Sequence, residues 1–303
     1  MIPSDLAPIA LFVYNRPDHL TRVAEALARN REASTSRLFV YSDAPKNTAA
    51  EEKVAAVRTA ARSIAGFQSV DVVEQSVNQG VARSVMQGVG RLTERFGKVI
   101  VLEDDLLPSP YFLGYLNSAL DRYESDERVI SEHAYTYPVH AQLPETFFLR
   151  GADCWGWATW KRGWDLFDPD AQKLLEELQR HRLTRAFDFD GNYPYTEMLQ
   201  DCIEGRNDSW AIRWYASAFL QGKLTLYPGC SQIQNIGVDG SGRHLGKTSF
   251  FTHGDWGRAV LVGDIPVEES TVGRDSFARF MRKVVYPSPT RRLLRRLRKL
   301  IGA

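Results

Sequence analysis

Short apolar runs and amphipathic segments alternate along the first third of the chain. Four apolar runs have the length and flanks of strands: 8–15, 36–43, 69–76 and 98–105. Each run is followed by a segment with apolar positions at helical spacing: 18–30, 49–64, 80–96 and the residues after Pro110. Ser109 is the predicted cap of the last helix, and Pro110 is its predicted first residue. This order predicts a parallel sheet with right-handed crossovers. The last run, KVIVLEDD, lacks polar alternation, which indicates a strand covered on both faces.

The pattern is less regular after about residue 126. Short strands are expected at 128–131, 146–150 and 224–227. Helices are expected near 171–186, 195–204 and 210–221. Neither an internal repeat nor a low-complexity linker separates the two halves, so we expect one α/β body.

The composition indicates a large hydrophobic core and gives no sign of a membrane-spanning helix. The 303 residues include 15 Phe, 12 Tyr and 7 Trp, and no window reaches the roughly 18 uncharged apolar residues of a spanning helix. The apolar run Ile9–Tyr14 is short and lacks the basic lead-in of a signal peptide. The cysteines (Cys154, Cys202 and Cys230) are odd in number and lack metal-ligand spacing, so we expect a cytoplasmic protein.

Charge is unevenly distributed. Residues 274–303 hold ten Lys or Arg and one Asp, which leaves 28 basic and 36 acidic side chains in the rest. An acidic body does not favour a nucleic-acid partner. Segment 289–303 combines leucines at helical spacing with arginines, a pattern typical of an interfacial helix on anionic lipid. A solvated terminal helix or an oligomer contact is the alternative.

Three consecutive carboxylates, Glu103, Asp104 and Asp105, follow the apolar VIVL. Like charges repel, so they are either solvated or gathered around a positive group. Ligands collect at the carboxyl ends of parallel strands, where such acids hold Mg²⁺ or Mn²⁺ on a diphosphate. An exposed acidic turn before the next helix is the alternative. The VIVL run draws the triplet toward the core and favours the metal site.

A strand ending in EDDL, followed by proline and an aromatic-rich helix, resembles the metal-binding motif of GT-A-fold glycosyltransferases. The N-acetylglucosaminyltransferase I group and bacterial family-2-like relatives are the most similar. IALFVYNRPDHL resembles their first strand and nucleotide-contacting loop, which includes Tyr14 and Arg16. VYSDAP resembles the loop whose acid, here Asp43, meets uracil, and NQGVARSVMQGV places Arg83 near the nucleotide or its phosphates. The four blocks cover residues 8–123.

The resemblance also implies roles within the triplet. Asp105 would bind the metal directly, while Asp104 and Glu103 would contact the ribose or donor sugar and orient the metal's waters. A divalent cation, Mn²⁺ or Mg²⁺, would offset the charge that develops on the departing nucleoside diphosphate.

The second half contains the candidate acceptor residues. The segment RGADCWGWATWKRGW holds Trp157, Trp160 and Trp164 at helical spacing, which is typical of core packing. We expect packing for Trp160 and Trp164. Trp155 and Trp157 flank a glycine that permits close approach, so they and Asp153 are candidate contacts for the acceptor or a sugar.

Inverting transfer requires a carboxylate that takes the proton of the attacking hydroxyl. Asp208, ahead of a tryptophan-bearing helix, is our candidate base, and a helix cap or first-turn acid is the alternative. Asp201 and Glu204 are the next candidates. Late histidines often bind metal or phosphate in GT-A enzymes, which makes His244 a candidate, although an isolated loop histidine is more often surface.

The sequence therefore predicts an α/β GT-A fold with one mostly parallel sheet. Residues 1–125 would form the nucleotide-sugar-binding half, 126–273 the acceptor-binding and catalytic half of the same domain, and 274–303 a basic amphipathic tail. The predicted activity is metal-dependent, inverting transfer from a UDP-sugar or similar donor to a glycan or lipid-linked glycan in surface polysaccharide assembly. We expect it at the inner face of the cell membrane. A sugar-1-phosphate nucleotidyltransferase and a non-catalytic glycan-binding protein are the alternatives; the absence of GxGxxG disfavours a Rossmann dehydrogenase.

Overall fold

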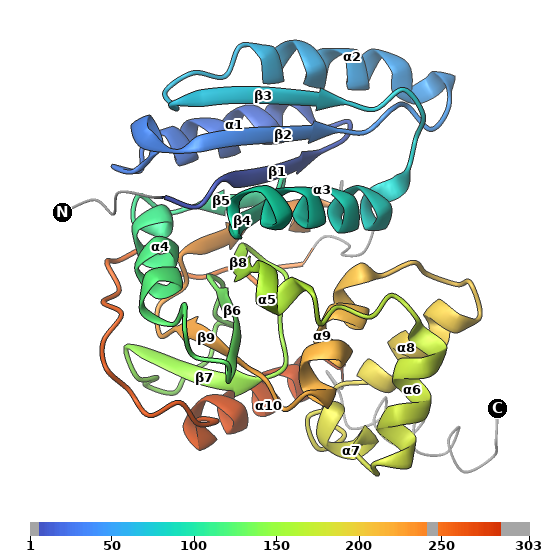
Figure 1. The fold of residues 1–303 in the computed structure, drawn as a ribbon, viewed down its shortest axis with the longest axis vertical. Helices are drawn as coiled ribbons and strands as arrows, with labels where there is room; N and C mark the ends of the chain where they lie inside the picture. The colour runs from blue at the N-terminus through green and yellow to red at the C-terminus, as the bar shows by residue number, and fades with distance from the viewer. Residues whose placement is uncertain (1–5, 241–247, 286–303) are drawn as a thin grey trace.

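One eight-stranded sheet forms the centre of the computed structural model, which describes residues 6–240 and 248–285. Its strand order is β3-β2-β1-β4-β8-β6-β9-β7 (Figure 1). The strands are β1 (Ile9–Val13), β2 (Arg37–Ser42), β3 (Ser69–Glu74), β4 (Lys98–Glu103), β6 (Val129–His133), β7 (Thr146–Arg150), β8 (Trp157–Trp160) and β9 (Leu224–Pro228). A smaller antiparallel pair joins β5 (Leu106–Pro108) to β10 (Ile233–Asn235).

The first four strands in space are all parallel, as the alternating pattern predicts. Beyond β4 the sheet is mixed: β8 is antiparallel to both β4 and β6, β9 is parallel to β6, and β7 is antiparallel to β9. Four of the seven pairings are therefore parallel. The predicted fold class, an α/β protein with one mostly parallel sheet flanked by helices, is confirmed.

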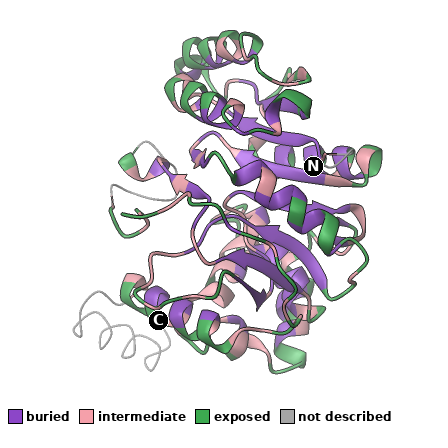
Figure 2. Ribbon diagram, turned by 90° about the vertical axis from the view of Figure 1, so that its left-hand side faces the viewer, coloured by how far each residue is buried: buried purple, intermediate pink, exposed green. Residues whose placement is uncertain are grey.

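The helices cover both faces of the sheet. They are α1 (Pro17–Ala28), α2 (Thr48–Arg62), α3 (Gly80–Phe96), α4 (Phe112–Arg122), α5 (Lys161–Trp164), α6 (Ala171–Arg180), α7 (Thr184–Phe187), α8 (Tyr195–Ile203), α9 (Trp210–Leu220) and α10 (Thr271–Val285). Alternate residues of β1 point to opposite faces: Leu11 packs in a core with α1 and α4, and Phe12 in a core with α3 and α9. The strands inside the sheet are largely buried between these layers, whereas the edge strand β3 is partly exposed (Figure 2).

Strand pairing explains one strand that the sequence did not predict, β8, and one helix whose start was predicted too early, α4. Trp157–Trp160 form β8 instead of a helical stripe, because β4 and β6 pair with this segment on both sides. The helix after Ser109 begins only at Phe112. Ser109 extends the β5–β10 ladder through its N–H bond to the Gln232 carbonyl at 2.8 Å, which delays the helix.

The predicted helix 171–186 is interrupted. α6 ends at Arg180, Arg182 adopts a left-handed φ of 57°, and the short α7 follows. A residue in that conformation ends the helical hydrogen-bond series.

Helix α10 crosses the predicted boundary between residues 273 and 274. Its Phe277 and Met281 are buried in a core with β7, α6 and α9, so residues 274–285 belong to the body. The predicted interfacial helix 289–303 lies outside the described residues. Across the part of the chain that is described, no helix is long and apolar enough to cross a membrane.

Candidate active site

The acidic triplet lies where β4 ends. Glu103 is the last residue of β4, and Asp104 and Asp105 form the turn that follows. Because β4 pairs with β1, the triplet lies beside the loop that carries Arg16 from β1 into α1. Arg16 Nη2 lies 3.0 Å from Asp105 Oδ2 and also contacts Asp104 Oδ1. The positive group among the acids is therefore Arg16.

One guanidinium does not compensate three carboxylates at this edge of the sheet. Burial raises the pKa of the Asp104 carboxyl to about 6, although Arg16 lowers it. Burial, followed by repulsion from Asp105 and Asp104, raises the pKa of Glu103 to about 8. A further cation at this position would favour the charged carboxylates.

The loop after β1 holds Arg16 beside the acids. The N–H of Tyr14 donates to Asp104 Oδ2 over 3.4 Å, and the Tyr14 hydroxyl accepts the N–H of Lys46 at 3.0 Å. Arg16 Nη1 is buried and lacks a hydrogen-bond acceptor among the described residues. A buried donor without an acceptor is costly, so this atom favours an anionic ligand.

Asp43 and Arg83 occupy different environments around α3. The Asp43 carboxylate accepts the N–H groups of Gln79 at 2.9 Å and Gly80 at 2.8 Å, so it stabilises the start of α3. Arg83 lies exposed in the first turns of the same helix. A contact of either residue with a nucleotide stays a prediction.

A cavity of about 450 Å³ joins the two halves of the predicted site. Five candidate residues from distant parts of the sequence line it together: Glu103, Asp105, Asp153, Trp155 and Asp208. At the triplet end the wall is completed by Asn235 and Gly237. Gly237 packs so closely that a Cβ there would collide with Asp105 Oδ2, so glycine is required for this approach.

Asp208 lines the cavity and does not cap the helix that follows it. Ser209, not Asp208, caps α9: its side chain accepts the N–H of Ile212 at 3.3 Å. Asp208 is exposed and forms an ion pair with Arg213 Nη2 at 2.6 Å. The cap interpretation of Asp208 is therefore wrong. The other two candidate bases, Asp201 and Glu204, both pair with Arg206 and are not among the cavity-lining residues.

The tryptophans divide between the cavity and the core. Trp155 is partly buried and packs against Tyr135, with ring centroids 4.7 Å apart. Trp157 is fully buried, and its ring packs against Trp210 at 5.6 Å and Trp214 at 5.7 Å. Trp157 is thus part of the core between β8 and α9, and we leave it out of the proposed site. Trp160 and Trp164 are also buried, as expected for packing residues.

Sequence reasoning missed the aromatic end of the cavity. Its wall includes six tyrosines and phenylalanines from four separate segments: Tyr137, Phe189, Tyr195, Tyr227, Phe277 and Phe280. They are spread over more than a hundred positions and form no short motif, so only the fold gathers them. The aromatic content of the second half was the one available signal.

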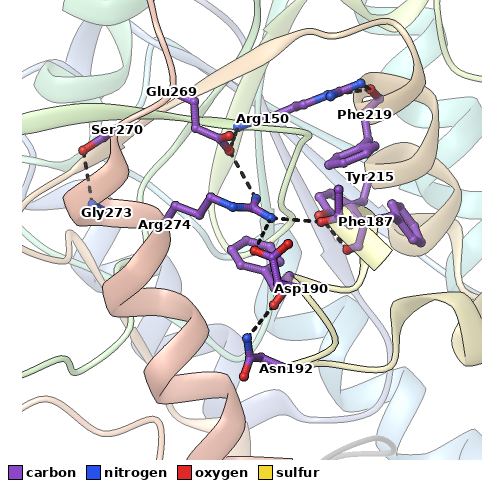
Figure 3. Close-up of polar contacts among 12 residues, drawn as sticks. Arg150, Phe187, Asp190, Asn192, Tyr215, Phe219, Glu269, Ser270, Gly273 and Arg274 are labelled. Atoms are coloured by element: carbon purple, nitrogen blue, oxygen red, sulfur yellow. Dashed lines mark hydrogen bonds and ion pairs between the residues drawn. The ribbon is translucent and has the colours of Figure 1, made fainter. Parts of the chain in front are cut away.

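An ionic network fixes this wall to α10. Figure 3 shows Arg274 extending from α10 toward Asp190, and its Nη2 lies 3.1 Å from Asp190 Oδ2. The same guanidinium lies 3.4 Å from Glu269 Oε1 and above the ring of Phe189, 5.0 Å from its centroid. Phe189 and Asp190 have left-handed φ values of 48° and 58°, which surrounding contacts must hold.

The triplet suits a hard divalent cation only as part of a larger set of ligands. No group of three or more His, Cys, Asp or Glu that could hold a metal occurs within residues 6–240 and 248–285. The half-buried Asp105 carboxylate is the type of oxygen donor that Mg²⁺ and Mn²⁺ prefer. Diphosphate and water oxygens would have to supply the other ligands. His244 lies outside the described residues.

No protein-family model matches the chain, and no curated protein matches its sequence. Among solved structures, it is similar to TarS 1–349 from S. aureus, with a TM-score of 0.42 and 11% identity over 76% of this chain and 60% of that one. A glucosyl-3-phosphoglycerate synthase from Mycobacterium tuberculosis, in complex with Mn²⁺, UDP and glucosyl-3-phosphoglycerate, gives a TM-score of 0.35 and 13% identity over 58% of this chain and 67% of that one. The chain spans about 60% of the TarS 1–349 structure. At these scores the likenesses carry no argument about activity, so we argue the function from the site.

Proposed function

We propose that this chain is a metal-dependent glycosyltransferase with a GT-A fold, related to the N-acetylglucosaminyltransferase I group and bacterial family-2-like enzymes. It transfers a sugar from a nucleoside-diphosphate sugar, with UDP favoured, to a hydroxyl of a glycan or glycolipid. One observation carries the proposal: a single cavity is lined by Glu103 and Asp105 at the end of β4 and by Asp153 and Asp208 from the second half of the chain. Donor chemistry and acceptor activation would thus share one cavity.

The residues at the triplet end suit a diphosphate. Asp105 is the proposed ligand of Mn²⁺ or Mg²⁺, which when bound would offset the negative charge of the leaving diphosphate. The unpartnered Nη1 of Arg16 suits a phosphate oxygen. Glu103 lines the same cavity and would accept hydrogen bonds from the ribose or the donor sugar.

Asp208 suits the role of general base at the other wall. A carboxylate on the face opposite the leaving group takes the proton of an attacking hydroxyl, which gives inversion. The ion pair with Arg213 fixes the orientation of its carboxylate. We also propose that the basic segment 289–303 brings the enzyme to the inner membrane face, where surface polysaccharides are assembled on lipid-linked acceptors.

Two alternatives are less well supported. A sugar-1-phosphate nucleotidyltransferase would usually carry a glycine-rich loop after the first strand, where this chain has YNRPDHL. A non-catalytic glycan-binding protein would not need Glu103 and Asp105 at the donor end of the cavity together with Asp208.

Calorimetric titration with UDP in the presence of Mn²⁺ tests the proposal. We expect wild-type protein to bind UDP and Asp105→Ala to lose most of this affinity. Asp201→Ala, which removes a partly exposed acid outside the cavity, is the matched control and should bind normally. Equal affinity of Asp105→Ala and wild type, or no binding by wild type, would refute the donor site.

A further inference from the structure

Asp153 lies among aromatic hydroxyls on the cavity wall. The Tyr137 hydroxyl donates to Asp153 Oδ2 over 3.5 Å, and the N–H of Cys154 donates to Oδ1 at 2.8 Å. Burial, and then the negative charge of Asp153, raises the pKa of both Tyr195 and Tyr227, which places their hydroxyls near this carboxylate. All three tyrosines line the cavity.

This carboxylate has no cationic partner of its own. No lysine or arginine forms an ion pair with Asp153 in the portion of the chain that the structure describes. His133 Nε2 lies 3.9 Å from Asp153 Oδ1, but that nitrogen accepts the N–H of Trp155 at 3.0 Å and therefore carries no proton. Burial also lowers the pKa of His133, so the ring is neutral.

Arg150, the arginine on the cavity wall among residues 6–240 and 248–285, is already engaged. Arg150 donates through Nε and Nη2 to the carbonyl of Phe219, at 2.9 and 2.8 Å, and its guanidinium lies over the Phe219 ring, 4.1 Å from the centroid. Among the other acids that line the cavity within the described residues, Asp105 pairs with Arg16 and Asp208 pairs with Arg213, while Glu103 lies beside Asp105 at the end of β4. Asp153 is the acid among the aromatic hydroxyls that lacks a cationic partner within the described residues.

We infer that the aromatic end of the cavity binds an acceptor that carries an ammonium group, such as the protonated amine of an amino sugar. The ammonium would donate to Asp153 and lie against the faces of the surrounding rings, the environment in which cation–π attraction is strongest. Tyrosine hydroxyls would hydrogen-bond the neighbouring sugar hydroxyls. This inference rests on the proposed function, because it specifies the acceptor of that site.

Calorimetric or NMR titration of the full chain with three monosaccharides tests the proposed ammonium subsite. Glucosamine carries the ammonium, glucose replaces it with a hydroxyl, and N-acetylglucosamine masks it as an amide. At neutral pH we expect glucosamine to bind about tenfold more tightly than either neutral sugar. Asp153→Asn should abolish that preference, whereas Asp201→Asn, which replaces a partly exposed acid outside the cavity, should keep it.

UDP with Mn²⁺ is titrated in parallel to separate the two hypotheses. Asp153→Asn should bind UDP normally, which shows that it is folded. Equal affinities for the three sugars, no binding by any of them, or a preference that survives Asp153→Asn would overturn the ammonium subsite. Loss of UDP binding by the wild type, with the glucosamine preference retained, would overturn the donor site and leave this subsite standing.

Discussion

Arg16 and Asp105 form an ion pair at the edge of the sheet, with Nη2 and Oδ2 3.0 Å apart. Arg16 also contacts Asp104, which is almost fully buried, so one guanidinium bridges two of the three acids. If Asp105 binds the metal, as we propose, Arg16 and the metal would compete for its carboxylate until a diphosphate accepted the guanidinium.

Arg16→Gln tests this competition. We expect the variant to bind Mn²⁺ alone more tightly than wild type, because Asp105 is no longer paired. We expect its affinity for UDP at saturating Mn²⁺ to fall about tenfold or more, because a charge-assisted phosphate contact is lost. Electron paramagnetic resonance of free Mn²⁺ measures the first quantity, and calorimetry measures the second.

Arg22→Gln is the matched control, since Arg22 is exposed on the same helix. It should leave both affinities unchanged. Weaker binding of Mn²⁺ alone by Arg16→Gln would contradict the competition and make Arg16 a support for the metal site.

Gly237, two residues after β10, lets the backbone of this segment approach the Asp105 carboxylate closely. Gly237→Ala would force its Cβ into the carboxylate, at a cost of about 1–3 kcal/mol, typical of overpacking. We expect the dissociation constant of UDP with Mn²⁺ to rise at least about fivefold. Gly254→Ala is the control, because nothing lies near its Cβ position. Normal binding by Gly237→Ala would show that Asp105 can move away from this position without loss of affinity for UDP.

The sheet and the triplet were predictable because their signals are local. Three of the four leading strands, β1, β2 and β4, carry a continuous apolar run, and Glu103–Asp105 directly follow the run of β4. β8 was not predictable, because Trp157 and Trp160 fit a helical stripe equally well and only pairing with β4 and β6 selects a strand. The aromatic end of the cavity depends on the same long-range contacts, so Asp153 could be named but its surroundings could not.

Asp208→Asn tests the base. The substitution keeps the shape of the side chain but removes its ability to take a proton, so we expect turnover to fall about 10²–10⁴-fold while UDP affinity stays unchanged. Release of UDP from a bound UDP-sugar, with water as the acceptor, measures turnover without knowledge of the natural acceptor. Asp201→Asn should behave as wild type. Turnover by Asp208→Asn within a few-fold of wild type would move the role to another acid.

Glu132 is another buried acid, and it is not among the residues that line the cavity. It is fully buried on β6, and neither carboxyl oxygen has a hydrogen-bond partner within the described residues. The hydroxyl of Tyr115, whose pKa is raised by burial and then by Glu132, is also buried and without a partner there. Burial raises the pKa of Glu132 well above its usual 4.5, although Arg162 lowers it.

This burial predicts how stability depends on pH. The folded protein holds the Glu132 proton more tightly than the unfolded chain does. The contribution of this group to the free energy of unfolding is therefore highest below about pH 4.5. It falls as the pH rises toward the raised pKa, by up to about 1.4 kcal/mol per pH unit. Glu132→Gln keeps the shape and cannot ionise, so urea denaturation between about pH 5 and 8 should show a flatter profile and greater stability at the upper end. Glu52→Gln, on the exposed face of α2, should retain the wild-type slope. Parallel profiles for wild type and Glu132→Gln would mean that the carboxyl is not protonated in the fold.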